Sequence, residues 1–130
     1  MKCLVTGGSG FLGSHVADEL TNKGYKVTIY DKKKSLYLKK GQKFIKGDIC
    51  NFRKLQKAVS KSQIVYNFAG LSDLNNAIKE PLLSVKLNVL ATVQLMELCT
   101  KFKIKRFIHA SSVYAISKDG GFYRSSKKAA

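Results

Sequence analysis

A tyrosine and a lysine near the end of the chain have the spacing that proton transfer requires. Tyr123 and Lys127 are four residues apart, so they share one face of the segment if it is helical. A lysine ammonium beside a phenol stabilises the phenolate and lowers a tyrosine pKa from its usual value of about 10. Such a tyrosine can take a proton from an alcohol, or return one to a carbonyl, near physiological pH. The spacing is also typical of ordinary surface helices, so its interpretation depends on the rest of the chain.

Two serines add a hydroxyl donor to this pair. Ser111 and Ser112 directly follow residues 104–110, an apolar stretch that predicts a strand. Open α/β sheets bind their ligands at the carboxyl ends of the strands. A serine hydroxyl at that place can hydrogen-bond the same reacting oxygen as the tyrosine. Together with a nicotinamide that accepts the hydride, these side-chain types can oxidise a secondary alcohol.

A glycine-rich turn near the start of the chain predicts the cofactor site. Residues 6–13 read Thr-Gly-Gly-Ser-Gly-Phe-Leu-Gly and follow the apolar run 3–5. Gly7 permits the tight turn out of a strand, Gly10 lets the main chain approach phosphates, and Gly13 lets helix and strand pack closely. The free N–H groups and the positive dipole end of the following helix then face a pyrophosphate.

An acidic residue follows this turn at the distance that a ribose contact requires. Apolar residues recur at helical spacing over 11–20, and residues 26–30 predict a second strand that ends at Asp31. Asp31 lies 18 residues beyond Gly13, and a carboxylate that binds a ribose 2′-hydroxyl is expected about 20 residues on. The same carboxylate would repel a 2′-phosphate, so the sequence predicts NAD rather than NADP. The lysine run 32–34 is the feature that opposes this preference.

Alternating strand and helix patterns predict the elements that must position these residues. Further strands are predicted over 43–46, 64–69 and 104–110. Helices are predicted from about Asn51, over 74–102 with an interruption at Pro81, and from about Phe122. This alternation predicts an α/β fold, a Rossmann-type doubly wound parallel sheet in the order 3-2-1-4-5, truncated before the remaining strands.

The last predicted helix is short. Only about two turns separate Tyr123 from the final residue, Ala130. Isolated helices shorter than ~12–15 residues are marginal in water. We therefore expect residues 1 to about 112 to be well ordered and the last ten or so to be frayed.

Length and composition restrict the class of protein. A chain of 130 residues with 45% hydrophobic residues predicts one globular domain. The apolar start is too short for a signal peptide, and no apolar run reaches the ~20 residues that span a bilayer. We therefore expect a cytoplasmic protein with no membrane partner. Three widely spaced cysteines, Cys3, Cys50 and Cys99, predict reduced thiols rather than disulfides or a metal site.

The net charge of +16 raises a nucleic-acid alternative. The basic residues are 21 lysines and 3 arginines spread along the chain, whereas arginine is preferred for bidentate contacts to phosphate and guanine. We interpret most of the lysines as a solvated face and expect no nucleic-acid partner. A basic surface still favours anionic small molecules such as dinucleotides and nucleotide-sugars.

Taken together, these motifs resemble a known family. The chain is similar to the N-terminal part of an extended short-chain dehydrogenase/reductase of the NAD-dependent epimerase/dehydratase group. That group includes nucleotide-sugar 4-epimerases and 4,6-dehydratases. The matching residues cover almost the whole chain: 6–13, Asp31, 47–49, 68–70, Asn88 with Thr92 and Leu95, 106–108, 111–114, and Tyr123 with Lys127.

The resemblance implies a role for each matching residue. It implies that Asp48 and Ile49 contact the adenine and that Asn88 supports the active site. By the same resemblance, Ser112, Tyr123 and Lys127 form the catalytic set, and Lys127 also bonds the nicotinamide ribose. The backbone at 69–70 is implied to lie beside the ribose and phosphates. The expected cofactor site comprises Gly7, Gly10, Phe11, Leu12, Gly13, Asp31, Asp48, Ile49, Phe68, Ala69, Gly70, Asn88 and Lys127.

Three departures from the family pattern affect these expectations. The serines are about two residues closer to Val113 and Tyr114 than usual, so both Ser111 and Ser112 are candidates. The stretch 112–123 is shorter than usual, which would trim a loop over the substrate. The substrate-binding portion that should follow is missing. We therefore expect an NAD-binding domain over 1–130, a fragment or a truncated product that is inactive alone. The full-length protein is expected to be a homodimer.

The predicted function is oxidation of a secondary alcohol of a nucleotide-sugar, as one step of epimerisation, dehydration or dehydrogenation. Tyr123 would be the base, Lys127 its activator and Ser112 the donor that positions the oxygen. The alternative is a non-catalytic dinucleotide-binding or redox-sensing module. The complete Tyr, Lys and Ser set argues against that alternative, and the missing end argues for it. A nucleic-acid-binding protein comes third, and a steep salt dependence would identify it.

Overall fold

The computed structural model describes all residues, 1–130. It has five strands joined by helices. The elements are β1 (Lys2–Thr6), α1 (Phe11–Asn22), β2 (Lys26–Asp31), β3 (Lys43–Lys46), α2 (Phe52–Val59), β4 (Ile64–Asn67), α3 (Leu74–Lys79), α4 (Pro81–Val85), the π-helix η1 (Lys86–Leu90), α5 (Ala91–Lys101), β5 (Arg106–His109), the 3₁₀ turn η2 (Val113–Ala115) and α6 (Gly121–Ala129).

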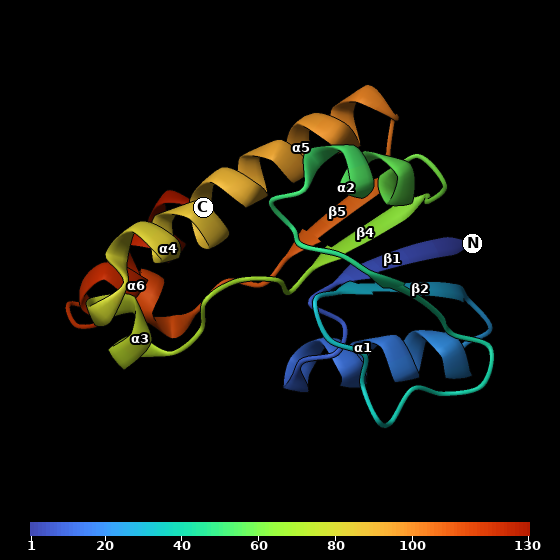
Figure 1. Cartoon of the computed structure of the whole chain (residues 1–130), viewed down its shortest axis with the longest axis horizontal. Helices are drawn as coiled ribbons and strands as arrows, with labels where there is room; N and C mark the ends of the chain where they lie inside the picture. The colour runs from blue at the N-terminus through green and yellow to red at the C-terminus, as the bar shows by residue number, and fades with distance from the viewer.

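The five strands form one parallel sheet in the order β3-β2-β1-β4-β5, as predicted. Helix α1 covers one face, and α2 and α5 cover the other (Figure 1). Successive side chains of β1 point to opposite faces of the sheet, because side chains along a strand alternate with a period of two. Cys3 and Val5 pack on the α1 side, whereas Leu4 packs on the side of α2 and α5. The sheet is therefore buried on both faces at its centre.

Local sequence signals set several of the element ends. The Asn51 side chain caps α2 by accepting from the Lys54 backbone N–H at 3.1 Å. Leu55 and Ala58 of α2 are buried, whereas Phe52 at its start is 37% exposed. The Asp73 side chain likewise caps α3, where it accepts from the Asn76 backbone N–H at 2.7 Å.

Two strands are shorter than the sequence predicts. β4 ends at Asn67 instead of continuing to Ala69, and β5 covers Arg106–His109 instead of 104–110. The apolar pattern continues past each strand end because the residues beyond it still pack against the protein. Phe68, for example, packs against the core on the α1 side. The chain leaves the sheet there and continues into the loops at its carboxyl edge.

A continuous helix runs from α4 through η1 to α5. Pro81 begins it, which suits a residue that has no N–H to donate. Over Pro81–Lys101 the helix has 21 residues and a window of mean hydropathy 1.4, so by length and composition it could cross a membrane. No such segment was expected from the sequence. Leu95 and Leu98 of α5 are fully buried against the sheet, so here it is a core helix.

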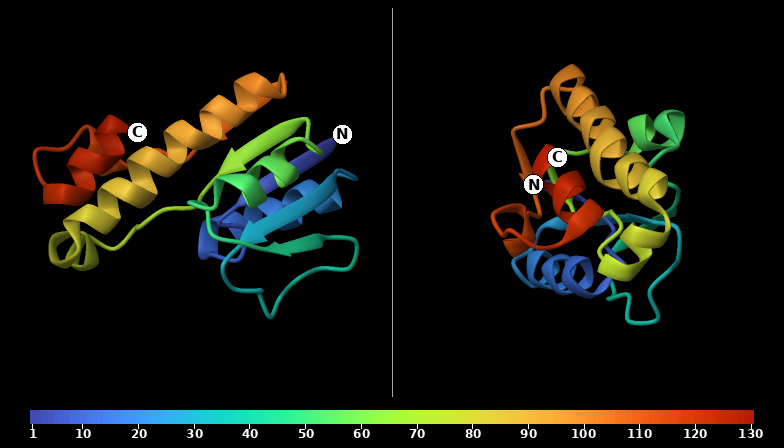
Figure 2. Two further views of the ribbon diagram at one scale, coloured as in Figure 1. Left: turned by 45° about the horizontal axis from the view of Figure 1, so that its top comes forward. Right: turned by 90° about the vertical axis from the view of Figure 1, so that its left-hand side faces the viewer.

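Helices α3, α4 and α6 form a cluster beyond the carboxyl ends of the strands (Figure 2). The expected fraying of the last residues is wrong in this structure, since α6 is a docked helix. Its Tyr123 and Ser126 are buried, and Ser126 Oγ receives hydrogen bonds from Asn88 Nδ2 at 2.9 Å and Ser84 Oγ at 3.1 Å. A nine-residue helix is too short to persist alone, so these contacts with the α4–α5 helix supply its stability.

Candidate functional site

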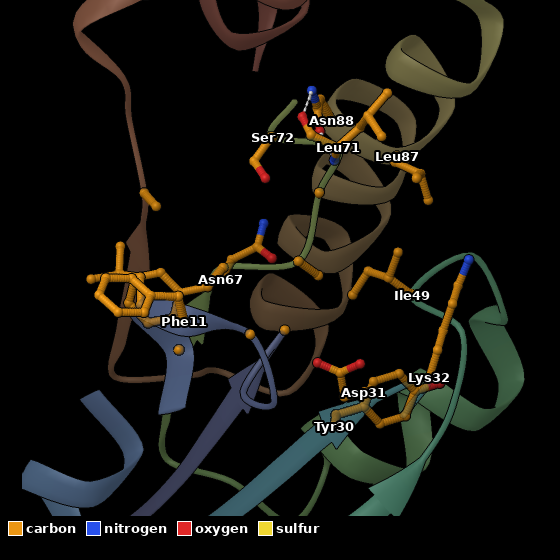
Figure 3. Close-up of a pocket in the computed structure, with 18 of the residues that line it drawn as sticks. Phe11, Tyr30, Asp31, Lys32, Ile49, Asn67, Leu71, Ser72, Leu87 and Asn88 are labelled. Carbon is orange, nitrogen blue, oxygen red and sulfur yellow. Dashed lines mark hydrogen bonds between the residues drawn. The ribbon is translucent and has the colours of Figure 1, made fainter. Parts of the chain in front are cut away.

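A cavity of about 510 Å³ opens at the carboxyl ends of the strands. The glycine turn and Asp31 line one part of it, and the end of β4 and η1 line another (Figure 3). Tyr123 and Lys127 of α6 complete the lining. This is the place where parallel α/β sheets bind ligands, since β1 and β4 are neighbours whose following helices lie on opposite faces. The cavity therefore lies at the topological switch point of the sheet.

The glycine turn leaves no room for side chains at two positions. Gly7 has a φ of +68°, and a Cβ there would lie 2.5 Å from the backbone nitrogen of Ala69. A Cβ on Gly13 would lie 2.2 Å from the Gly7 carbonyl oxygen. Both contacts are with backbone, which cannot give way. The turn therefore brings the start of α1 directly against the ends of β1 and β4.

The Asp31 carboxylate lies in the cavity at the end of β2 (Figure 3). Its Oδ2 accepts from the Ser9 backbone N–H at 3.0 Å, and its Oδ1 accepts from the Lys33 backbone N–H at 3.2 Å. These two bonds join the glycine turn to the loop after β2 and fix the direction of the carboxylate. Each oxygen retains acceptor capacity for a ligand hydroxyl.

Asp48 and Ile49 take different places beside this part of the site. Ile49 lines the cavity, whereas Asp48 does not. The Asp48 carboxylate accepts from the Cys50 backbone N–H at 2.9 Å and pairs with Lys32 Nζ at 3.1 Å. Burial alone would raise the Asp48 pKa, but the Cys50 hydrogen bond and the Lys32 ammonium outweigh it and lower the pKa. Asp48 is thus held ionised at the rim.

Tyr30 packs beneath the same rim, although no sequence motif marks it. Its hydroxyl donates to the Asp48 carbonyl oxygen at 2.9 Å, and its ring fills the space where a Cβ of Gly47 would be. Burial, with the Asp48 and Cys50 charges, raises the pKa of Tyr30 to about 12. The hydroxyl therefore stays protonated and remains a donor. A tyrosine inside an apolar strand pattern gives no sign of such a role.

Asn88 joins the loop after β4 to the helix cluster. Its Oδ1 accepts from the Leu71 N–H at 2.8 Å, and its Nδ2 donates to the Leu71 carbonyl at 3.0 Å and to Ser126 Oγ at 2.9 Å. It lies in η1, the π-helical turn Lys86–Leu90. Single π-turns inside α-helices are frequent at functional sites. Asn88 thus fixes both the loop and α6, and it also lines the cavity.

A polar row crosses three strands at the floor of the site. Thr6, Asn67 and His109 are paired in register on β1, β4 and β5. Thr6 Oγ1 donates to Asn67 Oδ1 at 2.7 Å, and Asn67 Nδ2 lies 3.1 Å from His109 Nδ1 and 3.3 Å from Thr92 Oγ1. Because the amide nitrogen faces the ring, Nδ1 is the acceptor and the neutral imidazole carries its proton on Nε2.

The buried His109 of this row predicts that the fold loses stability in acid. Burial first, and the Lys127 charge second, lower the His109 pKa below its usual 6.5. The unfolded chain then binds the proton more readily than the folded one. The free energy of unfolding should therefore fall as the pH drops through 6.5 toward the lowered value. Chemical denaturation between pH 7.5 and 5 measures this fall, and His109→Gln should reduce it. Carboxylates begin to titrate at the low end of this range.

The matched control for this measurement is His15→Gln, which removes the exposed histidine of α1. An NMR titration of the His109 ring gives the folded pKa directly. An acid dependence that is the same in His109→Gln and wild type would contradict the assignment of the fall to this histidine.

Tyr123 and Lys127 both reach the cavity from one face of α6. Tyr123 is 9% exposed, and its ring packs edge-on against Tyr114 with centroids 5.9 Å apart. Lys127 Nζ donates to the Ala110 carbonyl oxygen at 2.5 Å. Burial lowers the Lys127 pKa. The Tyr123–Lys127 pair therefore lies near the end of β5, because Lys127 is bonded to the residue that directly follows this strand.

The two serines lie differently. Ser111 lines the cavity next to Ala110, whereas Ser112 does not. The Ser112 hydroxyl caps η2 by accepting from the Tyr114 N–H at 3.3 Å. The structure therefore presents Ser111 to the site, and Ser112 retains a hydroxyl proton that it can donate.

The cavity brings together most of the residues that the sequence indicated. All the expected cofactor residues line it except Asp48, and both members of the Tyr–Lys pair do. Other lining residues were not expected in the cofactor site; most lie at strand ends or in the loop after β4, and Leu87 lies in η1. They are Tyr30, Lys32, Gly47, Asn67, Leu71, Ser72, Leu87 and Ala110, and Ser111 joins them as the alternative serine.

Comparisons with known proteins match almost the whole chain. The NAD dependent epimerase/dehydratase family matches residues 3–129. The chain is 35% identical over 124 residues to a UDP-glucose 4-epimerase of Klebsiella pneumoniae, covering 86% of this chain and 89% of that sequence. It is 34% identical over 124 residues to the dTDP-D-glucose 4,6-dehydratase of Dictyostelium discoideum, covering 85% of this chain but 29% of that one.

Solved structures agree with these sequence matches. A UDP-glucose 4-epimerase of Thermotoga maritima with UDP-glucose superposes with a TM-score of 0.91 at 26% identity, over 98% of this chain and 48% of that one. A UDP-glucose 4-epimerase of Thermus thermophilus in complex with NAD gives 0.89 at 26% identity, over 99% and 48%. The chain thus spans about half of these enzymes. By sequence and by fold, it belongs to the NAD dependent epimerase/dehydratase family.

Proposed function

We propose that residues 1–130 are the NAD-binding domain of an enzyme that oxidises a secondary alcohol of a nucleotide-sugar. The observation that supports this most directly is the single cavity. It holds the glycine turn and Asp31 at one end and Tyr123 with Lys127 at the other. Relatives of this family with similar chains include UDP-glucose 4-epimerases and a 4,6-dehydratase.

The residues present fit a dinucleotide. Any Cβ at Gly7 or Gly13 would overlap backbone atoms, so the glycines let the turn pack directly against α1. The first N–H groups of a helix have no partner within it, and those of α1 can therefore face a pyrophosphate. In this proposal the turn at 7–13 holds the pyrophosphate, Asp31 binds the adenine-side ribose, and Ile49 packs against the adenine. Gly70 and its neighbours border the middle of the cofactor. Asp48, whose carboxylate points to Lys32, acts at the rim rather than inside the cavity.

The other end of the cavity carries the proton chemistry. NAD, when bound, supplies a nicotinamide ring that accepts a hydride. Tyr123 takes the proton from the substrate hydroxyl, and the nearby Lys127 ammonium favours the phenolate. A serine hydroxyl hydrogen-bonds the same oxygen. We retain Ser112 as the expected donor, with Ser111 as the alternative because it lines the cavity. Asn88 keeps α6 in place.

Cofactor choice gives a direct test on the 130-residue chain. Asp31 should make NAD bind at least roughly tenfold more tightly than NADP, because a 2′-phosphate would meet a fixed carboxylate. The lysine run 32–34 could attract a 2′-phosphate and so oppose this preference. Lys32 is already paired with Asp48, which weakens that attraction. Isothermal titration with both cofactors measures the ratio, and Asp31→Ser should reduce it.

Lys40→Ala is the matched control, since Lys40 is exposed, makes no ion pair and lies outside the run 32–34. It should leave the ratio almost unchanged. Equal or tighter binding of NADP by the wild-type chain would show that the lysine run overrides Asp31. Absence of binding by either cofactor would refute the proposed function itself.

A further inference from the structure

The loop between β2 and β3 carries an exposed apolar pair that the proposed function does not use. Leu36 is 94% exposed and its neighbour Tyr37 is 84% exposed. We call these two residues the tip pair. The loop projects from the body of the protein beside α1 (Figures 1 and 2). Two adjacent large apolar side chains at such a place form a small patch that is available for contact.

The loop is anchored, so the tip pair is presented rather than folded back. Gln42 Nε2 donates to Asp18 Oδ1 of α1 at 2.9 Å, and the Lys39 N–H donates to Gln42 Oε1 at 3.0 Å. Leu38, which follows the tip pair, packs against the core on the α1 side. The apolar residue that can reach the core is therefore partly buried, and the two before it remain exposed.

Lysines surround the tip pair on both sides. The loop segment 32–43 has six lysines and no acidic residue, and so contributes +6 of the net charge of +16. Lys32 and Lys39 are paired with acids. Lys33, Lys34 and Lys40 are exposed and have no carboxylate within 4.0 Å. Three lysines without an ion pair therefore flank the tip pair along the loop.

We propose that this loop docks onto a membrane surface rich in anionic lipid. Lysines near an anionic bilayer are attracted to its negative surface potential. The leucine and tyrosine then enter the interface, where an aromatic ring with a polar tip is well accommodated. This contact is peripheral and needs no membrane-spanning helix. It differs from the sequence expectation of no membrane partner, and it is independent of the proposed function.

The composition of the loop favours lipid over nucleic acid. Residues 32–43 contain six lysines and no arginine, whereas arginine supplies most base-specific and bidentate phosphate contacts. The exposed Leu36 would gain little against a phosphate backbone but is buried at a lipid interface. A nucleic-acid partner is therefore the competing outcome of the test below.

Co-sedimentation of the 130-residue chain with vesicles tests the proposal. We expect binding to phosphatidylcholine vesicles that contain about 30% phosphatidylserine, at least roughly tenfold weaker binding to phosphatidylcholine alone, and a further fall at high salt. Leu36→Ser with Tyr37→Ser should weaken binding roughly tenfold. Lys34→Glu with Lys40→Glu should do the same.

Matched double variants control for hydrophobicity and charge. Leu82→Ser with Ile116→Ser removes two apolar residues that are about as exposed as the tip pair. Lys105→Glu with Lys118→Glu makes the same charge change at exposed lysines outside the loop. Each should weaken binding less than roughly twofold. Equal effects of loop and control variants would overturn the proposal, as would equal binding to neutral vesicles or no binding. Tighter binding to a DNA duplex than to anionic vesicles would favour nucleic acid instead. NAD titration of the loop variants reports separately on the proposed function.

Discussion

Tyr123→Phe should reduce turnover by about 10²–10⁴-fold in an enzyme that carries this chain together with a substrate-binding part. The change keeps the ring that packs against Tyr114 and removes only the hydroxyl that would exchange a proton with the substrate. NAD affinity should hold, because the turn at 7–13 and Asp31 are untouched. Steady-state kinetics on a nucleotide-sugar, with NAD titration beside them, measure both quantities.

Tyr114→Phe is the matched control, since it removes a hydroxyl from the neighbouring ring. Its effect should be far smaller. The same assay on Ser111→Ala and Ser112→Ala decides which serine acts, because the one that hydrogen-bonds the reacting oxygen should lower turnover without weakening NAD. If Tyr123→Phe kept more than about a tenth of wild-type turnover, tyrosine would not be the acid–base group. The non-catalytic module would then be the better interpretation.

Gly13→Ala should both destabilise the domain and disrupt cofactor binding. The new methyl group would lie 2.2 Å from the Gly7 carbonyl oxygen, so α1 must move away from the turn. Forced overpacking of this kind costs about 1–3 kcal/mol of unfolding free energy. NAD affinity should fall at least roughly tenfold, because the N–H groups that face the pyrophosphate move with the helix. Chemical denaturation and isothermal titration on the 130-residue chain measure the two effects.

Gly24→Ala separates strain from site geometry. Gly24 has a φ of +80°, but no atom lies within 4 Å of a Cβ placed there. This variant should lose about 1–2 kcal/mol from backbone strain alone and keep NAD affinity. If Gly13→Ala bound NAD as tightly as Gly24→Ala, the close approach of helix and turn would not be needed for the cofactor.

Much of the fold follows from local sequence signals. The strand over 43–46 and the caps at Asn51 and Asp73 depend on residues close in sequence. The β-α-β pattern with its glycine turn then restricts the topology, because parallel strands need crossover helices and these connections are right-handed. The strand order, the position of the glycine turn at the cavity and that of the Tyr123–Lys127 pair could therefore be predicted.

Tertiary contacts decided the rest. Whether α6 forms depends on Ser126 reaching Asn88 and Ser84, residues some forty positions earlier, which no helix propensity reports. The exclusion of Asp48 from the cavity depends on Lys32 coming within 3.1 Å of it from another loop. The row of Thr6, Asn67 and His109 exists only because three strands pair in register. A single sequence specifies local geometry directly, whereas long-range pairings arise only once the sheet has brought their partners together.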